Sequence, residues 1–330
     1  MTAADIQSLF FQHLKSVLPP HVSMVDEVAE TLGISVDSAY RRIRNEKPIS
    51  LEELGKICIR FKISLDKLIH LQDDSFLFWG HLANSSGFSF EQYLGDILRQ
   101  LELMNSFSAK HMYFLVKDIP PMAHFLIPEL TAFRCFFWNK SILLDESYKR
   151  KKFSVTEFVP EQIELAKKII HVHCKIPGTE IWNIESINST LRQMQFYKEA
   201  GVFTKDEDYE ILLSKVELLI NHLERQAELG LKFQVDEAPA ADAASYRLMH
   251  NELILGDNTI FCELGDTKIT YITHSVINFM ATKDAVFNDH MQSALKNLIN
   301  KSIQISTVGE KERLRFFNAL RKKIRQPMLA

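Results

Sequence analysis

The sequence predicts a mostly α-helical protein with an α+β second domain. A five-helix N-terminal domain is expected to precede a helix-rich domain that contains a small, partly antiparallel sheet. Glycine and proline number only 11 and 10 among 330 residues, well below usual proportions, which excludes collagen and turn-rich all-β sandwiches. Apolar residues make up 46% of the chain, enough to build buried cores. The length exceeds what one core usually supports, so we expect domains at 1–72 and 73–330.

Helix caps punctuate the first 70 residues. Apolar residues recur at helical spacing over 4–18 and stop at Pro19-Pro20, which cannot continue a helix. Serine is the preferred first residue of a helix, and glycine often follows the last. Serines precede four further helical patterns, at Ser23, Ser35, Ser50 and Ser64, and Gly33 ends the first of these. The spacing therefore predicts five helices in this domain.

The second domain is predicted to alternate long helices with a few strands. Residues 110–116 (KHMYFLV) lack helical spacing and favour a strand, and TIFCEL and KITYITH flank a Gly265-Asp266 turn as in a hairpin. The stretch SYRLMHNELILGD also has the period of strands, and about 235–245 is expected to be an exposed loop. Helices are expected over about 89–106, 128–144, 160–174, 184–200, 205–229, 275–302 (with a break at Lys283-Asp284) and 309–325.

Residues 28–43 carry the pattern of a helix-turn-helix. That motif needs a small residue where its two helices cross and a glycine where the chain turns with positive φ. Ala29 is the small residue and Gly33 the turn. Apolar residues that would fix the angle between the helices are Val28, Leu32, Ile34, Ala39 and Ile43. The second helix, about 35–46, is expected to enter the major groove of DNA.

The outer face of this second helix holds the side chains expected to bind DNA. Helical geometry projects Val36, Asp37, Tyr40, Arg41 and Arg44 together, with Ser38 and Arg42 on the flanks, Ser35 at the helix start and Lys47 just past its end. Arginine suits guanine edges and phosphates, and tyrosine suits a phosphate or a thymine methyl group. A helical hairpin that only packs, with its arginines solvated, is the alternative for this segment.

The segment 28–69 resembles the Cro and lambda-repressor (XRE-like) helix-turn-helix class. The run DSAYRRIRNEKPISLEEL is especially similar to the BetR-like subgroup of bacterial regulators. The resemblance covers about residues 4–70 and implies sequence-specific binding of double-stranded DNA as a homodimer, on half-sites roughly 34 Å apart. Many members of the class place a glutamine at the start of the first motif helix, where this chain has Met24-Val25. The remaining residues resemble uncharacterised companion domains of such regulators.

Charge and cysteine usage fit a cytoplasmic regulator. The formal net charge is −3, and residues 1–70 contain nine acidic and nine basic side chains, so DNA binding would depend on local contacts. We expect no signal peptide, no membrane span and no disulfides: the N-terminus lacks a basic start, no apolar run reaches about 18 residues, and the four cysteines lie far apart in apolar surroundings.

Weaker signals leave other functions open for the second domain. His171, His173 and Cys174 do not share one helix face, so we expect no metal site and no cofactor. Phosphate-loop, nucleophile-elbow and zinc-protease motifs are absent, and no enzyme is predicted. Basic residues at 149–152 and along 311–325 suit either DNA phosphates or solvent, and the aromatic run 133–138 suits a core. An enzyme targeted by the helix-turn-helix, or an interaction adaptor, remains the alternative for 75–330, and an effector of unknown chemistry is left open.

Overall fold

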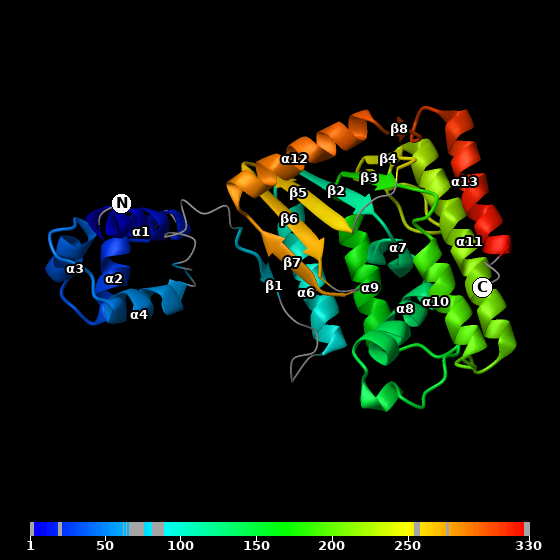
Figure 1. Ribbon diagram of the computed structural model, residues 1–330, viewed down its shortest axis with the longest axis horizontal. Helices are drawn as coiled ribbons and strands as arrows, with labels where there is room; N and C mark the ends of the chain where they lie inside the picture. The colour runs from blue at the N-terminus through cyan, green and yellow to red at the C-terminus, as the bar shows by residue number, and fades with distance from the viewer. Residues whose placement is uncertain are drawn as a thin grey trace. The chain divides into compact units, whose positions relative to one another are not determined.

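The computed structural model divides the chain into two compact units, Met1–Leu77 and Phe78–Ala330. It describes residues 3–18, 22–61, 63, 65, 76–80, 89–253, 258–274 and 277–326. The two units are described separately below (Figure 1). The expected domain boundary after residue 72 and the fifth helix expected from Ser64 lie outside the described residues.

The first unit is built of short helices around one small core. The helices are Ala3–Val17 (α1), Met24–Leu32 (α2), Val36–Ile43 (α3) and Leu51–Phe61 (α4). Phe10, Leu14, Val28, Ala39 and Ile57, at least one residue from each helix, are buried in one cluster. The helices predicted to begin after Ser23, Ser35 and Ser50 are confirmed by α2, α3 and α4.

The second unit contains one mixed sheet. Its strands are Trp79–Gly80 (β1), Lys110–Val116 (β2), Gly178–Trp182 (β3), Tyr246–His250 (β4), Thr259–Leu264 (β5), Thr267–Thr273 (β6), Phe279–Thr282 (β7) and Ile303–Gln304 (β8). Within the described residues these eight strands run in the order β1-β7-β6-β5-β2-β3-β4-β8. The central β2, β3 and β4 are parallel, and the remaining pairs are antiparallel. A mixed helix-and-sheet unit is thus confirmed, but the expectation of a small sheet is wrong.

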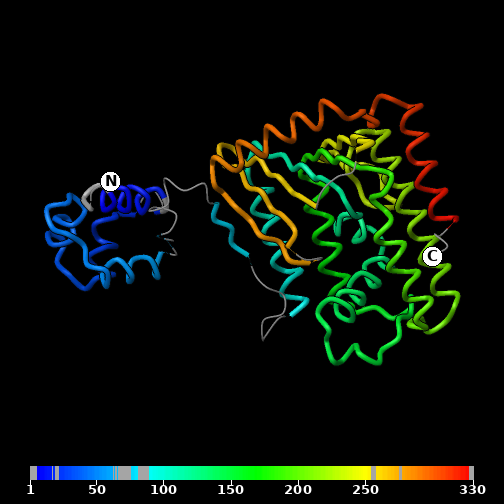
Figure 2. The backbone as a smooth tube through the Cα atoms, viewed as in Figure 1, coloured from blue at the N-terminus to red at the C-terminus, as the bar shows by residue number. Residues whose placement is uncertain are grey.

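Helices cover both faces of this sheet. They are Phe90–Asn105 (α6), Pro121–Phe125 (α7), Pro128–Phe137 (α8), Pro160–His173 (α9), Asn188–Glu199 (α10), Asp206–Leu229 (α11), Ala285–Asn300 (α12) and Glu310–Arg325 (α13). A large core packs α6, α8, α9, α10, α11 and α13 on one face. A smaller cluster packs Leu295 of α12 on Ile181, Met249 and Phe261 of the other face. Figure 2 shows α12 crossing the sheet and the terminal α13 running beside α11.

Two sequence expectations differ from this unit. The helix expected over 275–302 begins only at Ala285, because Asp284 caps it and residues 279–282 form β7. The helix expected from 184 begins at Asn188, after a turn in which Asn183 N–H donates to the Ser186 hydroxyl. The strand over 110–116 and the hairpin at Gly265-Asp266 are confirmed by β2, β5 and β6. None of the described helices has both the length and the apolar character to cross a membrane.

Candidate nucleic-acid interface

A capped turn joins α2 to α3. Gly33 adopts a left-handed conformation with φ 63° and ψ 39°, and its N–H group bonds back to the end of α2. The Ile34 N–H donates to the Ala29 carbonyl at 3.0 Å, which completes the closure of the helix end. Ser35 then opens α3, since its hydroxyl accepts a hydrogen bond from the Ser38 N–H at 3.3 Å. The turn is therefore fixed by local chemistry, as the sequence predicts.

Replacing Gly33 with alanine is expected to destabilise the first unit by about 1–2 kcal/mol, because a Cβ strains the left-handed conformation. No atom lies within 4 Å of the position that the new Cβ would take, so the backbone alone sets the cost. Amide hydrogen exchange across 24–61 measures the loss. The control is Gly55→Ala, which lies inside α4 with equally open surroundings and should stabilise by about 1 kcal/mol. Equal effects of the two changes would contradict this account.

Small residues set the crossing of α2 on α3. Ala29 and Ala39 are both buried, beside Val28 and Ile57 in the core of the unit. An alanine at each crossing position lets the two helix backbones approach closely, and Leu32, Ile34 and Ile43 pack around them. The inner side of α3 is thereby committed to the core, and its other side is left to solvent.

Most of the predicted DNA-binding residues lie on the outer side of α3. Val36 is 53% exposed and Tyr40 43% exposed. Asp37, Arg41, Arg44 and Ser35 are also exposed, whereas Ser38 is half-buried. Lys47 is exposed in the segment after α3. The structure therefore brings Val36, Asp37, Tyr40, Arg41 and Arg44 to one surface, which we call the α3 face.

Two contacts restrain the long side chains of the α3 face. The Arg44 guanidinium lies 4.4 Å from the centre of the Tyr40 ring, and its Nη2 donates to the Tyr40 hydroxyl at 3.3 Å. Arg41 Nε lies 3.9 Å from the Glu46 carboxylate, with both side chains more than half exposed. Exposed pairs of this kind contribute little energy, so both guanidinium groups remain available to a ligand.

Arg42 is not part of the α3 face, and its placement among the DNA-binding residues is wrong. Its side chain is only 6% exposed, and its Nε and Nη2 donate to the two oxygens of Glu53 at 3.0 and 2.5 Å. Its Nη1 also donates to the Ser38 carbonyl at 2.9 Å. The hydrogen bonds from Arg42 lower the pKa of Glu53. Arg42 is thus committed to an internal ion pair that joins α3 to α4.

The second motif helix is also shorter than expected. It was predicted over 35–46, but α3 ends at Ile43, with Arg44 as its last, capping residue. Asn45 has a φ of 61°, a left-handed conformation that asparagine tolerates better than most residues. The chain therefore turns away after Arg44, and Lys47 lies beyond the helix.

Gln7 of α1 positions the end of α3, a role that the sequence did not indicate. Its Nε2 donates to the carbonyls of Arg42 and Lys47 at 2.7 and 2.9 Å, and its Oε1 accepts from the Ile49 N–H at 2.9 Å. The buried amide thus satisfies three backbone groups of the turn after α3. The only signal in the sequence is a glutamine directly after Ile6 in an apolar helical pattern.

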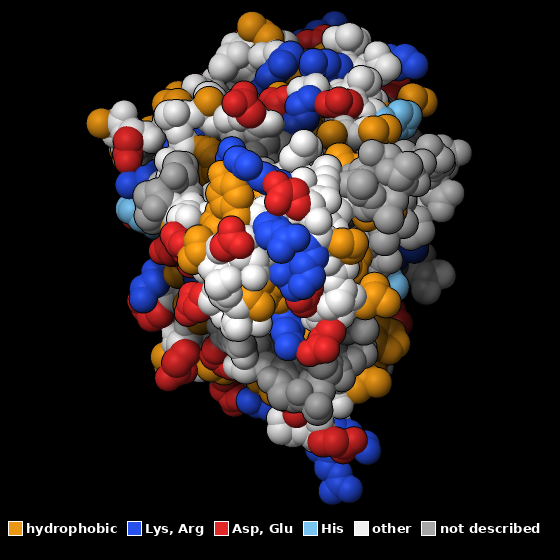
Figure 3. Space-filling model, turned by 90° about the vertical axis from the view of Figure 1, so that its left-hand side faces the viewer, with side chains coloured by type: hydrophobic (Ala, Val, Ile, Leu, Met, Phe, Trp, Pro, Cys, Tyr) orange, Lys and Arg blue, Asp and Glu red, His pale blue; other side chains and the backbone are white. Residues whose placement is uncertain are grey.

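Charges of both signs surround the α3 face. Figure 3 shows side chains of both charge signs mixed on the face that it views, and beside Arg41 and Arg44 on α3 lie the exposed Asp37 and Glu46. Arg60, on α4, pairs with Glu27 and Glu30 at 2.9 and 2.8 Å. A nearly neutral surface attracts DNA only weakly at long range. Binding to DNA would therefore depend on short-range contacts made by individual cationic side chains.

The basic C-terminal helix of the second unit binds to its own unit. Arg321 pairs with Glu224, Lys323 with Glu185 at 2.7 Å, and Arg325 with Glu217 at 2.5 Å. These contacts fix α13 on its neighbours and favour a structural role for its cations. The aromatic run also belongs to the core, since Phe133, Phe136, Phe137 and Trp138 are all buried.

Two buried polar clusters lie inside the second unit. The Lys232 ammonium donates to His173 Nε2 at 3.2 Å, and burial lowers the pKa of Lys232 to about 8. Arg134 bonds to His124 Nε2 at 2.7 Å and donates to the Thr190 hydroxyl at 2.9 Å. All these side chains are less than 9% exposed, so neither cluster is open to a substrate. Among the described residues no group of His, Cys, Asp and Glu is arranged to hold a metal ion.

Comparison of the chain with protein-family models, with curated proteins and with solved structures gave no match. The interpretation of the α3 face therefore depends on its own geometry and chemistry.

Proposed function

We propose that the chain is a sequence-specific DNA-binding transcription regulator whose α3 enters the major groove. The observation that supports this most is the α3 face: a glycine turn and a serine cap orient a helix whose solvent side presents Tyr40, Arg41 and Arg44. In known motifs of this kind the solvent-facing side of the second helix lies in the major groove, where its side chains contact base edges and phosphates. In this proposal α2 and α3 form the helix-turn-helix.

Each exposed side chain has a specific part in the proposal. Arg41 and Arg44 donate to guanine O6 and N7 or to phosphates, and Tyr40 contacts a thymine methyl or a phosphate. Asp37 can accept from the N4 amino group of cytosine. Ser35 and the first N–H groups of α3 suit a phosphate, as does Lys47. Arg42 and Gln7 hold the helix in place without touching DNA.

We infer that the second unit forms the homodimer contact and responds to a signal. Regulators of this class bind paired half-sites as homodimers in the bacterial cytoplasm, and we carry that arrangement over as part of the proposal. The second unit has its own sheet and core, and a separately packed unit of this kind can carry a function distinct from that of the first unit.

Selection of bound duplexes from a random-sequence library tests the function. The full chain at moderate salt is expected to enrich one recurring motif, repeated with a spacing of about one helical turn. Mapping of bound sites across the source genome should then return the same motif. The proposal would be overturned if no recurring motif is enriched at salt concentrations at which the chain still binds DNA measurably without regard to sequence.

A further inference from the structure

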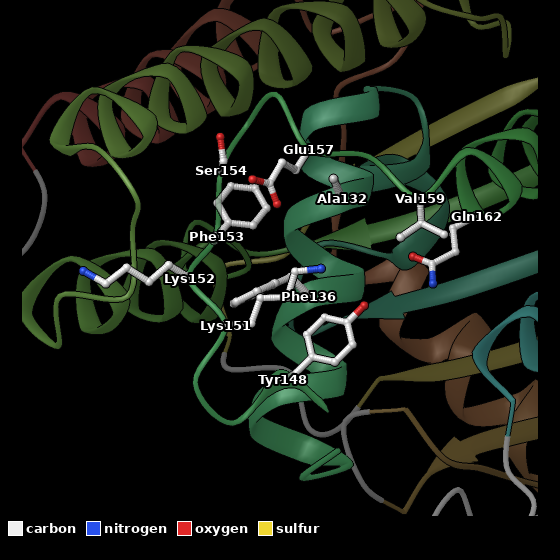
Figure 4. A pocket seen from close by; sticks show the side chains of 10 residues that line it. All are labelled: Ala132, Phe136, Tyr148, Lys151, Lys152, Phe153, Ser154, Glu157, Val159 and Gln162. Atoms are coloured by element: carbon white, nitrogen blue, oxygen red, sulfur yellow. The ribbon is translucent and has the colours of Figure 1, made fainter. Parts of the chain in front are cut away.

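A hollow in the surface of the second unit lies where α8, α9 and the segment 148–159 meet (Figure 4). It is lined by Ala132, Phe136, Tyr148, Lys151, Lys152, Phe153, Ser154, Glu157, Val159 and Gln162. About 30 Å³ is free for the centres of water-sized atoms, and one water needs about 10–15 Å³ on this measure. The enclosed part thus holds about two or three water-sized atoms, and because the hollow is partly open to solvent, the rest of a small ligand can extend outward.

Two hydrogen-bond acceptors, Gln162 and Glu157, line separate parts of the hollow. Gln162 is only 5% exposed, and its Nε2 donates to the Glu91 carboxylate at 2.9 Å. That hydrogen bond lowers the pKa of Glu91, so Glu91 is ionised and can only accept. The Gln162 amide must therefore direct its oxygen away from Glu91, and Figure 4 shows this oxygen pointing into the hollow. The Glu157 carboxylate lies on another part of the rim, beyond Ala132 and Val159 in the view of Figure 4, and it has no ion-pair partner among the described residues.

Two hydrogen-bond donors, Lys151 and Tyr148, also line the hollow. The Lys151 ammonium points into the hollow (Figure 4), and its Nζ lies 5.0 Å from the centre of the Tyr148 ring. Within the described part of the chain no carboxylate is close enough to form an ion pair with it. Burial raises the pKa of Tyr148, so its hydroxyl remains protonated and can donate. Lys152, in contrast, points away from the hollow.

The rim of the hollow is fixed before any ligand arrives. Lys140 Nζ donates to the carbonyls of Tyr148, Lys149 and Lys151 at 2.8, 2.8 and 3.1 Å, which ties down the segment that carries Lys151. Phe153 N–H donates to the Val202 carbonyl at 2.9 Å. A preorganised site of this kind loses little conformational entropy on binding.

We propose that the hollow binds a small α-amino acid as its zwitterion. Lys151 and Tyr148 contact the ligand carboxylate, Glu157 contacts its ammonium group, and a short apolar side chain lies on Phe136. Gln162 Oε1 faces the ligand from another part of the rim. A ligand with only a negative charge would be repelled by Glu157, and a ligand with only a positive charge would be repelled by Lys151. An α-amino acid carries both charges on a few heavy atoms, as the lining requires. This site is independent of DNA binding.

Calorimetric titration of the full chain with L-alanine, propionate and ethylamine tests the site. Propionate lacks the amino group of alanine, and ethylamine lacks its carboxylate. L-Alanine is expected to saturate one site, and each half-molecule to bind at least about tenfold more weakly, because each loses one charged set of hydrogen bonds. Absence of saturation by L-alanine at millimolar concentrations, or equal binding of either half-molecule, would overturn the proposal.

Variants of the lining identify the site. Lys151→Met and Glu157→Gln should each weaken L-alanine binding about fivefold or more, with the melting temperature unchanged because both side chains are exposed. Lys152→Met removes the same charge one residue away and should leave the affinity within about twofold. Glu157→Gln provides an independent readout if Lys151→Met does not fold. An equal effect of Lys152→Met, or none from either lining variant, would show that the ligand binds elsewhere.

Discussion

Alanine in place of both Arg41 and Arg44 is expected to weaken specific DNA binding by about 2–6 kcal/mol, since each bidentate contact to a base contributes about 1–3 kcal/mol. The two guanidinium groups are exposed at the C-terminal end of α3, and among the described residues their partners are Glu46 and Tyr40. Fluorescence anisotropy on the selected duplex and on a scrambled duplex measures the change. Specific affinity should fall much further than non-specific affinity.

A charge-matched variant is the control for this prediction. Lys15→Ala with Lys56→Ala removes two positive charges from α1 and α4, outside the α3 face. This control should lower the affinity for the selected and the scrambled duplex by the same factor. The loss corresponds to the sequence-independent attraction of two lysines to DNA phosphates. If the control and the arginine variant lose the same affinity on the selected duplex, the α3 face is not the reading surface.

Methionine in place of Arg42 is expected to destabilise the first unit by about 2–3 kcal/mol. Removal of one partner of a fully buried ion pair costs about 3–5 kcal/mol. The cost here should be smaller, because Glu53 is 21% exposed and its carboxylate can be hydrated once Arg42 is gone. DNA binding should weaken with it, because α3 then loses its link to α4. Amide exchange over 24–61 measures stability, and anisotropy measures binding.

Arg60→Met is the matched control for Arg42. Arg60 also bridges two elements, through Glu27 and Glu30, but its side chain is 38% exposed. Its loss should cost no more than about 1 kcal/mol. A cost for Arg42→Met no larger than this would contradict the assigned role of the buried pair. Adding Glu53→Leu to Arg42→Met should recover part of the stability, since it removes the unpaired charge but also the acceptor of the Ser50 N–H at the start of α4.

The Arg42 effect should also depend on pH. The pKa of Glu53 in the folded state lies below its ordinary value of 4.5, so the folded chain binds this proton less readily than the unfolded chain. The stability that the pair provides is therefore complete above about pH 4.5 and is lost as the pH falls through the folded-state value. The difference in the free energy of unfolding between wild type and Arg42→Met should therefore become smaller as the pH falls below about 4.5.

Local signals predicted much of the first unit. Ser23, Gly33 and Ser35 act within three or four residues of themselves, so their hydrogen bonds can be inferred from the order of residues. The end of α3 could not be inferred in this way, because Gln7 lies some 40 residues before the carbonyl that it binds. The burial of Arg42 likewise depends on Glu53, 11 residues later and on another helix.

The sheet of the second unit was harder to predict than its helices. All five residues of β3 are buried, so GTEIW shows no alternation of polar and apolar residues. The sequence predicts the start of a helix where β7 lies, although it correctly indicates a break at Lys283-Asp284. The polar groups of the hollow all lie between Tyr148 and Gln162, but their spacing matches no motif that would mark a site in the sequence.

Methylation interference on a selected duplex tests the central claim most directly. Methylation of guanine N7 places a group in the major groove, whereas methylation of adenine N3 places one in the minor groove. If α3 reads the major groove, N7 methylation at one or two guanines of each half-site should abolish binding by the wild type. Those same guanines should lose their effect in the Arg41→Ala, Arg44→Ala variant. Binding that tolerates every N7 methyl group, and is blocked only from the minor groove, would contradict the account.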